Sequence, residues 1–159
     1  MISINTKLKN AIQDLRFLLN RGYRRPSAID FVANHYRLLK QERHFLTRAI
    51  FSNKEIIAHR KKLIKLKEIK GKLLAIDGYN VIITLESLIQ NKPLILCDDG
   101  FVRDISAVFR KHKITKATVK ALDKLFRLMK KYLPAEVRFF LDQPVSHSGE
   151  LANLVRERI

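Results

Sequence analysis

Aspartate residues follow three short apolar runs in the second half of the chain. The runs cover residues 73–76, 93–97 and 137–141, and the acids that follow them are Asp77, Asp98, Asp99 and Asp142. Apolar runs of this length, the third of which includes Arg138, are typical of buried parallel strands, and the carboxyl ends of such strands lie along one edge of a sheet. We therefore expect these carboxylates, distant in sequence, to converge at that edge.

Carboxylates that converge repel one another, and a hard divalent cation such as Mg²⁺ or Mn²⁺ is the usual remedy. Such a metal can clamp phosphate oxygens and generate hydroxide for the hydrolysis of a phosphodiester. Aspartate also forms turns with glycine and caps helices, so each acid has a structural interpretation as well. The recurrence of the pattern at three strand ends favours a metal site. Asp104 lies inside a predicted helix, where a solvated position on the helix face is the simpler interpretation.

The segments between these runs predict helices. Helical patterns cover residues 80–89 and 101–111, a longer helix begins after Thr115 and ends near Pro134, and a last helix begins at Ser146 or Ser148. Strands that alternate with helices indicate an α/β domain, and right-handed crossovers between them make its sheet parallel. We expect this domain to occupy residues 72–159.

The N-terminal part of the chain has a different period. Between residues 7 and 60, apolar residues recur every three or four positions, which predicts four helices. Gly22 offers a stop for the first helix, Pro26 a start for the second, and Ser52 with Glu55 a capping box for the fourth. The expected order is a basic helical region over 1–60, a basic connector over 61–71 and then the α/β domain.

Positive charge dominates the chain and indicates a polyanionic partner. The formal net charge is +17, and residues 1–72 contain 18 basic and 5 acidic residues, which leaves +13. Nucleic acid is the commonest intracellular polyanion, and the predicted helices lack the bulky apolar anchors beside a clean basic face that membrane-surface helices carry. RNA is therefore the expected partner, and a membrane is not. The candidate RNA contacts are Arg21, Arg24, Arg25, Lys61, Lys62, Lys65, Lys67 and Lys70.

Both groups of basic residues also have a structural interpretation. The arginines accompany Tyr23 in a predicted loop, a mixture that suits single-stranded RNA but also a solvated turn. The lysines alternate with apolar residues, as in a solvated connector, although their position beside the aspartate motif favours contact with RNA. Both alternatives stay open at this level.

The ten residues at 73–82, Leu-Leu-Ala-Ile-Asp-Gly-Tyr-Asn-Val-Ile, resemble the opening strand and turn of NYN and PIN-like ribonuclease domains. That resemblance implies that Asp77 binds a catalytic metal and that Asn80 supports it. More closely, the whole chain resembles an archaeal family filed as domain of unknown function 434, which joins a helical N-terminal region to a PIN-like domain. The segments that carry this closer resemblance are residues 34–38, 97–104 and 140–152.

Together these features predict a metal-dependent endoribonuclease. We expect Asp77, Asp99 and Asp142 to bind Mg²⁺ or Mn²⁺, with Asp98 as the alternative to Asp99 in completing the shell, and Asn80 to orient a water or a ligand. A second hypothesis is a non-catalytic RNA-binding protein, because PIN-like domains usually carry a further acidic residue and one or two more strands beyond the position of Asp142. We expect the chain to be truncated or shortened there, and a homodimer is one way to complete the sheet.

Other classes of protein find less support. Phosphatases of the haloacid-dehalogenase kind need a second aspartate where this chain has Tyr79, and no glycine-rich nucleotide loop occurs. Ser146 and His147 are neighbours, but neighbours in sequence rarely form a catalytic pair, and serine commonly caps helices. The single cysteine, Cys97, allows no intramolecular disulfide and is typical of a buried small hydrophobe, so a reducing, cytoplasmic location is expected.

Overall fold

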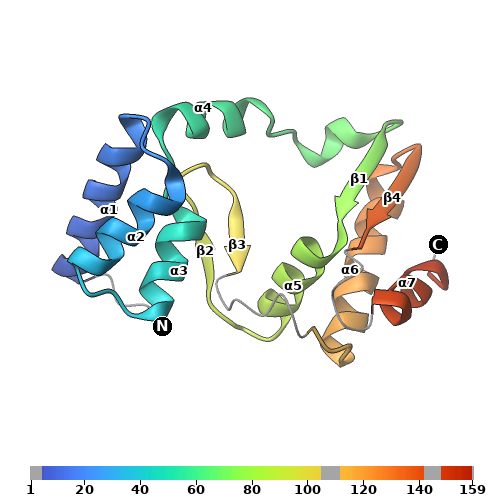
Figure 1. Ribbon diagram of the computed structural model, residues 1–159. Coiled ribbons are helices and arrows are strands. Elements are labelled where there is room, and N and C mark those ends of the chain that lie inside the picture. The colour runs from blue at the N-terminus through green and yellow to red at the C-terminus, as the bar shows by residue number, and fades with distance from the viewer. Residues whose placement is uncertain (1–4, 105–111, 142–147, 159) are drawn as a thin grey trace. The chain divides into compact units, whose positions relative to one another are not determined.

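The computed structural model describes residues 5–104, 112–141 and 148–158. The chain forms two compact units (Figure 1). The first unit combines residues 1–63 with 93–105, and the second combines residues 64–92 with 106–159. Within the described ranges, no helix has both the length and the apolar character needed to cross a membrane.

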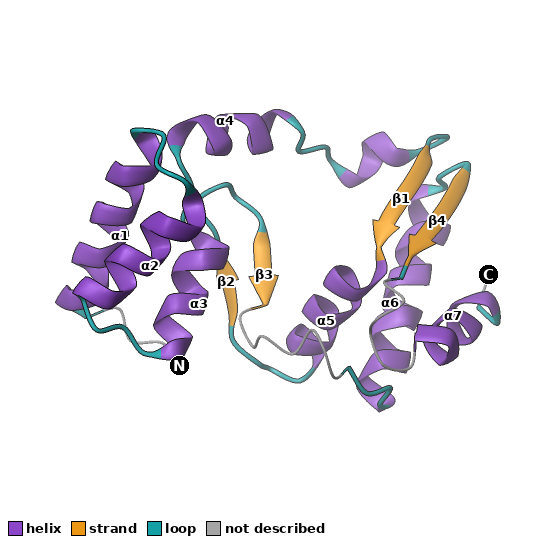
Figure 2. Cartoon of the chain, viewed as in Figure 1, coloured by secondary structure: helices purple, strands orange, loops and turns teal. Residues whose placement is uncertain are grey.

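Four helices build most of the first unit, as the apolar spacing predicts (Figure 2). They are α1 (Thr6–Asn20), α2 (Arg25–His35), α3 (Lys40–Ala49) and α4 (Asn53–Lys61). Asn5 caps α1 by accepting the Leu8 N–H, and Ser52 and Glu55 form the predicted capping box at the start of α4. Gly22 has a φ of +83°, a conformation that favours glycine, so the chain leaves α1 where the sequence predicts.

The first unit also contains a β-hairpin that comes from the predicted α/β region. Strand β2 (Leu94–Leu96) pairs antiparallel with β3 (Val102–Asp104). Cys97, directly after β2, is buried in the same core as Leu15 and Leu46 of the helices. The second apolar run thus packs with the N-terminal helices, and the compact units cut across the predicted regions 1–60, 61–71 and 72–159.

This hairpin corrects two expectations. The sequence predicts a parallel strand over 93–97 and a helix over 101–111, whereas residues 94–96 and 102–104 pair antiparallel; residues 105–111 lie outside the described ranges. The physical reason is the turn between the strands. Gly100 has a φ of +87°, and the Cys97 N–H donates to the Phe101 carbonyl oxygen at 2.9 Å. A chain that reverses in so few residues pairs antiparallel with itself.

A short parallel sheet with flanking helices forms the second unit, which confirms the predicted α/β class. Its elements are η1 (Leu66–Ile69), β1 (Leu73–Asp77), α5 (Gly78–Ile89), α6 (Lys116–Tyr132), β4 (Glu136–Phe140) and α7 (Ser148–Arg156). Strands β1 and β4 are parallel, with Asp77 opposite Phe140 at their carboxyl ends. Thr115 caps α6 by accepting the Ala117 N–H, as its position in the sequence predicts.

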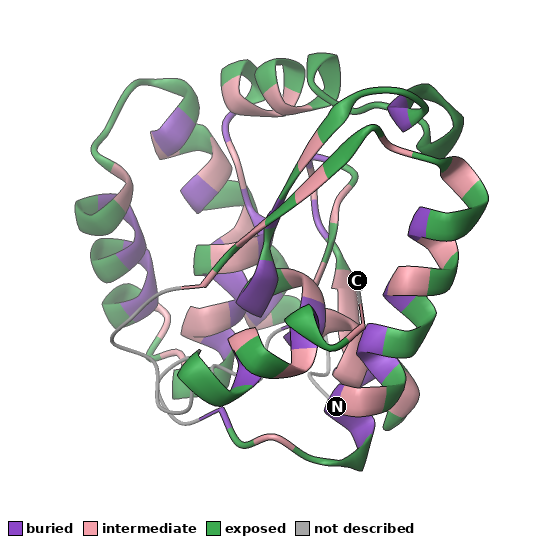
Figure 3. Cartoon of the chain, turned by 90° about the vertical axis from the view of Figure 1, so that its right-hand side faces the viewer, coloured by how far each residue is buried: buried purple, intermediate pink, exposed green. Residues whose placement is uncertain are grey.

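The two strands of the second unit bury one face and expose the other (Figure 3). Ile76 of β1 is buried in a cluster with Leu125 of α6, and Val137 of β4 packs against the same cluster. Asp77 and Phe140 are exposed. This alternation follows from the two-residue period of a strand. It leaves the carboxyl end of β1 open to solvent at Asp77.

Candidate functional site

Asp77 lies where β1 ends and α5 begins, and both of its carboxylate oxygens bind Asn80. Its Oδ1 accepts the Asn80 backbone N–H at 3.3 Å, which caps α5, and its Oδ2 accepts the Asn80 side-chain N–H at 2.5 Å. Both side chains are exposed. The N-terminal end of α5 favours a negative charge beside it. The result is an oriented, solvent-accessible carboxylate at the carboxyl end of a parallel strand.

Gly78 lets the end of β1 approach the end of β4. A Cβ atom at this position would lie 2.5 Å from Leu141 Cδ2 and 3.1 Å from the Phe140 carbonyl oxygen. A larger residue would therefore require the Leu141 side chain and the Phe140 carbonyl to shift, so the Asp77–Gly78 step lies directly against the end of β4. Asp142, the next residue of the sequence, lies outside the described ranges, and its predicted role with Asp77 stays a prediction.

Asp98 has partners within the first unit. Nη2 of Arg16 lies 3.1 Å from its Oδ1 and 2.9 Å from its Oδ2, and the Phe51 N–H donates to Oδ2 at 3.4 Å. The Asp98 backbone is held as well, because its N–H donates to the Ala49 carbonyl oxygen at 3.0 Å. Asp98 therefore ties the hairpin turn to α1 and to the end of α3.

Asp99 is fully buried and belongs to a network of hydrogen bonds. Arg103 donates to Oδ1 at 2.8 Å and to Oδ2 at 2.6 Å, and the Phe101 N–H donates to Oδ1 at 3.1 Å. His59 of α4 places Nδ1 2.9 Å from Oδ2. Burial alone would raise the pKa of Asp99, but the hydrogen bonds from Arg103, Phe101 and His59 outweigh it and lower the pKa to about 2. Asp99 is thus the acid of a structural ion pair that joins α4 to the hairpin.

Asp104 corrects a further expectation. It lies at the end of β3 and is 1% exposed, whereas the sequence predicts a solvated position on a helix. The antiparallel pairing of β3 with β2 explains the difference, because successive side chains of a strand point to opposite faces.

The predicted acidic residues consequently divide between the units. Asp77 and Asn80 are together in the second unit, and Asp98 and Asp99 bind basic side chains of the first unit. Across the residues that the structure describes, no group of three or more His, Cys, Asp or Glu side chains could hold a metal ion. The Mg²⁺ or Mn²⁺ site remains a prediction. Of the predicted ligands that the structure describes, Asp77 is the exposed one.

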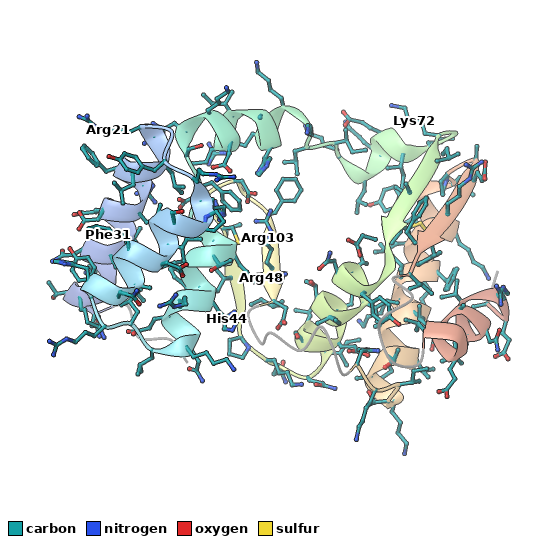
Figure 4. All side chains as sticks on the ribbon, in the orientation of Figure 1. Arg21, Phe31, His44, Arg48, Lys72 and Arg103 are labelled. Atoms are coloured by element: carbon teal, nitrogen blue, oxygen red, sulfur yellow. The ribbon has the colours of Figure 1, made fainter. Side chains whose placement is uncertain are left out.

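The predicted RNA contacts also differ in their surroundings. Arg21 and Arg24 are exposed, and the Arg21 guanidinium lies over the Phe17 ring at 4.5 Å (Figure 4). Arg25 instead donates to the carbonyl oxygens of Thr47 and Ile50 at 2.6 and 2.8 Å, so it closes the C-terminal end of α3. The five predicted lysines between residues 61 and 70 are all exposed.

A buried polar network in the second unit has no signal in the sequence. Both carboxylate oxygens of Glu86 lie 3.0 Å from Nε2 of His112, and the Thr118 hydroxyl donates to the same carboxylate. His112 is 3% exposed and its ring meets the Tyr79 ring edge-on at 5.7 Å. The three residues join α5, the approach to α6 and the first turn of α6. Their role is to hold the helices that support the Asp77 strand end.

Sequence reasoning also missed the partners of Asp98 and Asp99. Arg103 follows Asp99 by four residues, a spacing that a turn could have suggested. His59 and Arg16 are 40 and 82 residues away from their acids, and no local pattern links them. Arg103 is labelled in Figure 4, on β3 of the first unit.

The fold and the site define a class of protein: a basic helical unit joined to a small α/β unit that exposes an aspartate at a parallel strand end. Residues 66–159 match the family described as "Domain of unknown function (DUF5616)", and residues 7–62 match "Protein of unknown function (DUF434)". The chain belongs to the DUF5616 family and carries a DUF434 region ahead of it. The resemblance to family 434 is thereby confirmed for residues 7–62, whereas the segments 97–104 and 140–152 lie in the DUF5616 match. The relationship to PIN-like and NYN ribonucleases remains a prediction.

An uncharacterised protein of Methanocaldococcus jannaschii is 43% identical to this chain over 152 residues. The match covers 96% of this chain and 73% of the relative. The relative is archaeal, as the resemblance implies. No solved structure gives a significant match to the chain.

Proposed function

We propose that this protein is a metal-dependent endoribonuclease whose site lies at the carboxyl end of β1. The observation that supports the proposal is the exposed Asp77 carboxylate, held by Asn80 at the end of a parallel strand pair. Open α/β sheets bind their ligands at this edge. The strong positive charge of the chain supports RNA as the substrate.

The oxygen donors of this edge fit a hard divalent cation. Asp77 is exposed and each of its oxygens keeps a lone pair beyond the bond to Asn80, and carboxylate oxygen is the preferred ligand of Mg²⁺ and Mn²⁺. Asp142 is the expected second ligand, because it follows the residue that contacts Gly78. A bound divalent cation would activate a water for attack and neutralise the charge that develops on the phosphate. Asp98 and Asp99 have no part in this version of the site, because Arg16 and Arg103 bind them.

The chain's own residues would hold and orient the reactants. The Asn80 amide keeps the Asp77 carboxylate in one rotamer, which reduces the rearrangement needed when a ligand binds. Exposed basic side chains, including Arg21, Arg24 and the lysines of 61–70, would neutralise phosphates of the bound RNA. Arg25 would act indirectly, by fixing the end of α3 beside the loop that carries Arg24.

The rival proposal is an RNA-binding protein without catalysis. It is favoured by one observation: two of the four predicted acidic ligands, Asp98 and Asp99, are bound to basic side chains of the first unit. A site reduced to Asp77 and Asp142 has fewer carboxylates for a metal than the three that the sequence predicts. The two proposals agree on RNA as the partner and differ in the need for a metal.

Cleavage of an end-labelled RNA that contains single- and double-stranded segments separates the two. We expect the native chain to cut it with Mg²⁺ or Mn²⁺, and we expect EDTA or Asp77→Asn to abolish the cleavage. Glu136→Gln is the matched control, because it makes the same carboxylate-to-amide change at an exposed acid of the same unit. Salt-sensitive binding without cleavage under either metal would instead establish the rival. An Asp77→Asn variant that cuts as well as Glu136→Gln would contradict a site at Asp77.

A further inference from the structure

Helix α6 carries six exposed basic side chains and one exposed acid, Asp123, on its outer face. Its inner face, with Ala121, Leu122, Leu125 and Met129 among others, is buried against the sheet and α5. Five of these basic residues recur at intervals of four, four, three and four positions, so they form one ridge along the helix. The residues of this α6 ridge are Lys116, Lys120, Lys124, Arg127 and Lys131.

The α6 ridge lacks the compensating charges that surface helices usually carry. Among the described residues, no acid forms an ion pair with any of the five side chains of the ridge. Lys131 lies over the Tyr132 ring, with its Nζ 5.4 Å from the ring centroid. Asp123 is the one acidic residue within Lys116–Tyr132, and Arg158 already binds it at 3.2 Å. Because Asp123 is bound to Arg158, it does not pair with a basic side chain of the ridge.

Helix α1 provides a contrast within the same chain. It is two residues shorter, and its exposed positions include Lys9, Gln13 and Asp14, a mixture of charges and neutral polar groups. Like charges four residues apart destabilise a helix by a few tenths of a kcal/mol for each pair. A solvated face needs no such excess of basic side chains, so the ridge indicates a polyanion that offsets the repulsion.

We infer that the α6 ridge binds the phosphodiester backbone of RNA, an inference that rests on the proposed function for RNA as the partner. Side chains four residues apart on a helix are separated by about 6 Å along its axis, so a helix of this length can meet several successive phosphates. Lysine presents a compact charge on a flexible stem and reads no base edge. Binding along the ridge is therefore independent of sequence and sensitive to salt.

An anionic membrane fits the ridge less well than RNA. A helix that lies on a membrane buries its apolar face among the lipids. The apolar face of α6 is already occupied, because Leu122 and Leu125 are 0% and 6% exposed within the core of the unit. The helix can offer charge to a membrane but no anchor.

The ridge also has a direction relative to Asp77. The Gly71 N–H, just before β1, donates to the carbonyl oxygen of Leu133, just after α6. The C-terminal end of α6 therefore lies at the start of β1, and the end that begins at Lys116 points toward the edge where β1 ends at Asp77. An RNA strand that follows the ridge is led toward this edge of the second unit.

The test compares two triple variants of the full chain that remove the same charge. The ridge variant carries Lys116→Gln, Lys120→Gln and Lys124→Gln. The control carries Lys9→Gln, Lys40→Gln and Lys92→Gln, which are exposed and scattered. Glutamine is a good helix former, so both variants should keep their helices, which circular dichroism checks. Fluorescence anisotropy then measures binding to a labelled single-stranded RNA across a salt series, with duplex RNA, single-stranded DNA and phosphatidylserine vesicles as parallel arms.

We expect the ridge variant to lose affinity by about 100-fold at roughly 0.1 M salt and the salt slope to fall by about 2, as for three lost phosphate contacts on a single strand. The control should lose several-fold less. The loss should recur with DNA and with RNA of another sequence. Equal losses of RNA affinity in both variants would overturn the proposal that the ridge binds RNA, while the proposal that the chain binds RNA would stand. A native chain that binds vesicles but no RNA would overturn both the ridge and the proposed function.

Discussion

The ion pair at Asp99 predicts a pH-dependent contribution to the stability of the first unit. The change is Asp99→Asn, which keeps the shape of the side chain and removes its charge. The folded carboxyl has a pKa of about 2 against an ordinary value of 3.8. That difference corresponds to about 2 kcal/mol, as an upper figure, because water screens Arg103 and His59, which are 26% and 33% exposed. The asparagine also leaves buried donors short of an acceptor.

The sign of the pH dependence follows from the lowered pKa. The contribution of Asp99 is complete above the unfolded pKa and is lost as the pH falls through the folded pKa. We therefore expect the pH-dependent part of the difference in unfolding free energy between the native chain and Asp99→Asn to be full at pH 7, about half at pH 3 and nearly absent at pH 2. Urea unfolding, followed by circular dichroism, measures this difference at each pH.

Asp30→Asn is the matched control for this prediction. Asp30 forms an ion pair with Arg43, but its side chain is 65% exposed, and such surface pairs contribute between 0 and about 1 kcal/mol. An Asp99→Asn variant no less stable than Asp30→Asn would refute the structural role of Asp99. A stability difference that stays constant between pH 7 and pH 3 would refute its ionisation in the folded state.

Two further substitutions test the supports of the candidate site in the second unit. Gly78→Ala should lower the unfolding free energy by roughly 1–3 kcal/mol, because its Cβ would overlap the residues at the end of β4. Gly149→Ala is the control: its Cβ would meet nothing within 4 Å, so the change should be neutral or stabilising. Equal effects of the two changes in urea unfolding would contradict the close approach of Gly78 to β4. Glu86→Gln should lower the unfolding free energy by about 1–3 kcal/mol, because it weakens the buried hydrogen bond to His112. The control Glu136→Gln, at an exposed acid, should lower it by about a few tenths of a kcal/mol. Equal losses in the two variants would argue against the Glu86 network.

The helices and their ends could be predicted because their signals are local. Apolar residues three and four apart mark the buried faces of α1 and α6, and Ser52 and Thr115 cap helices where their positions indicate. The β1 and β4 strands followed from short apolar runs, the second of which includes Arg138. In each case, the residues that decide the structure lie within a few positions of one another.

The association of the hairpin with the helical unit could not be predicted in the same way. An apolar run shows that residues 94–96 are buried, but the surface that buries them is set by partners such as Ala49 and Arg16, far away in sequence. The Glu86 network is a second case, because His112 and Thr118 are 26 and 32 residues beyond Glu86. Long-range partners leave no period and no local motif.

The aspartate–glycine step occurs twice, and its two environments explain why the acidic residues separate. Gly100 has a φ of +87° and turns the chain back, which draws Asp99 into the fold, where Arg103 neutralises it and His59 lies within hydrogen-bond distance. Gly78 lies in the first turn of a helix, and the chain moves on from β1 rather than back along it, so Asp77 stays at the strand end. The same two residue types therefore build a structural ion pair in one unit and an exposed carboxylate in the other. We therefore expect a metal-dependent activity of this chain to depend on Asp77, and we expect substitutions of Asp98 and Asp99 to act through stability rather than through catalysis.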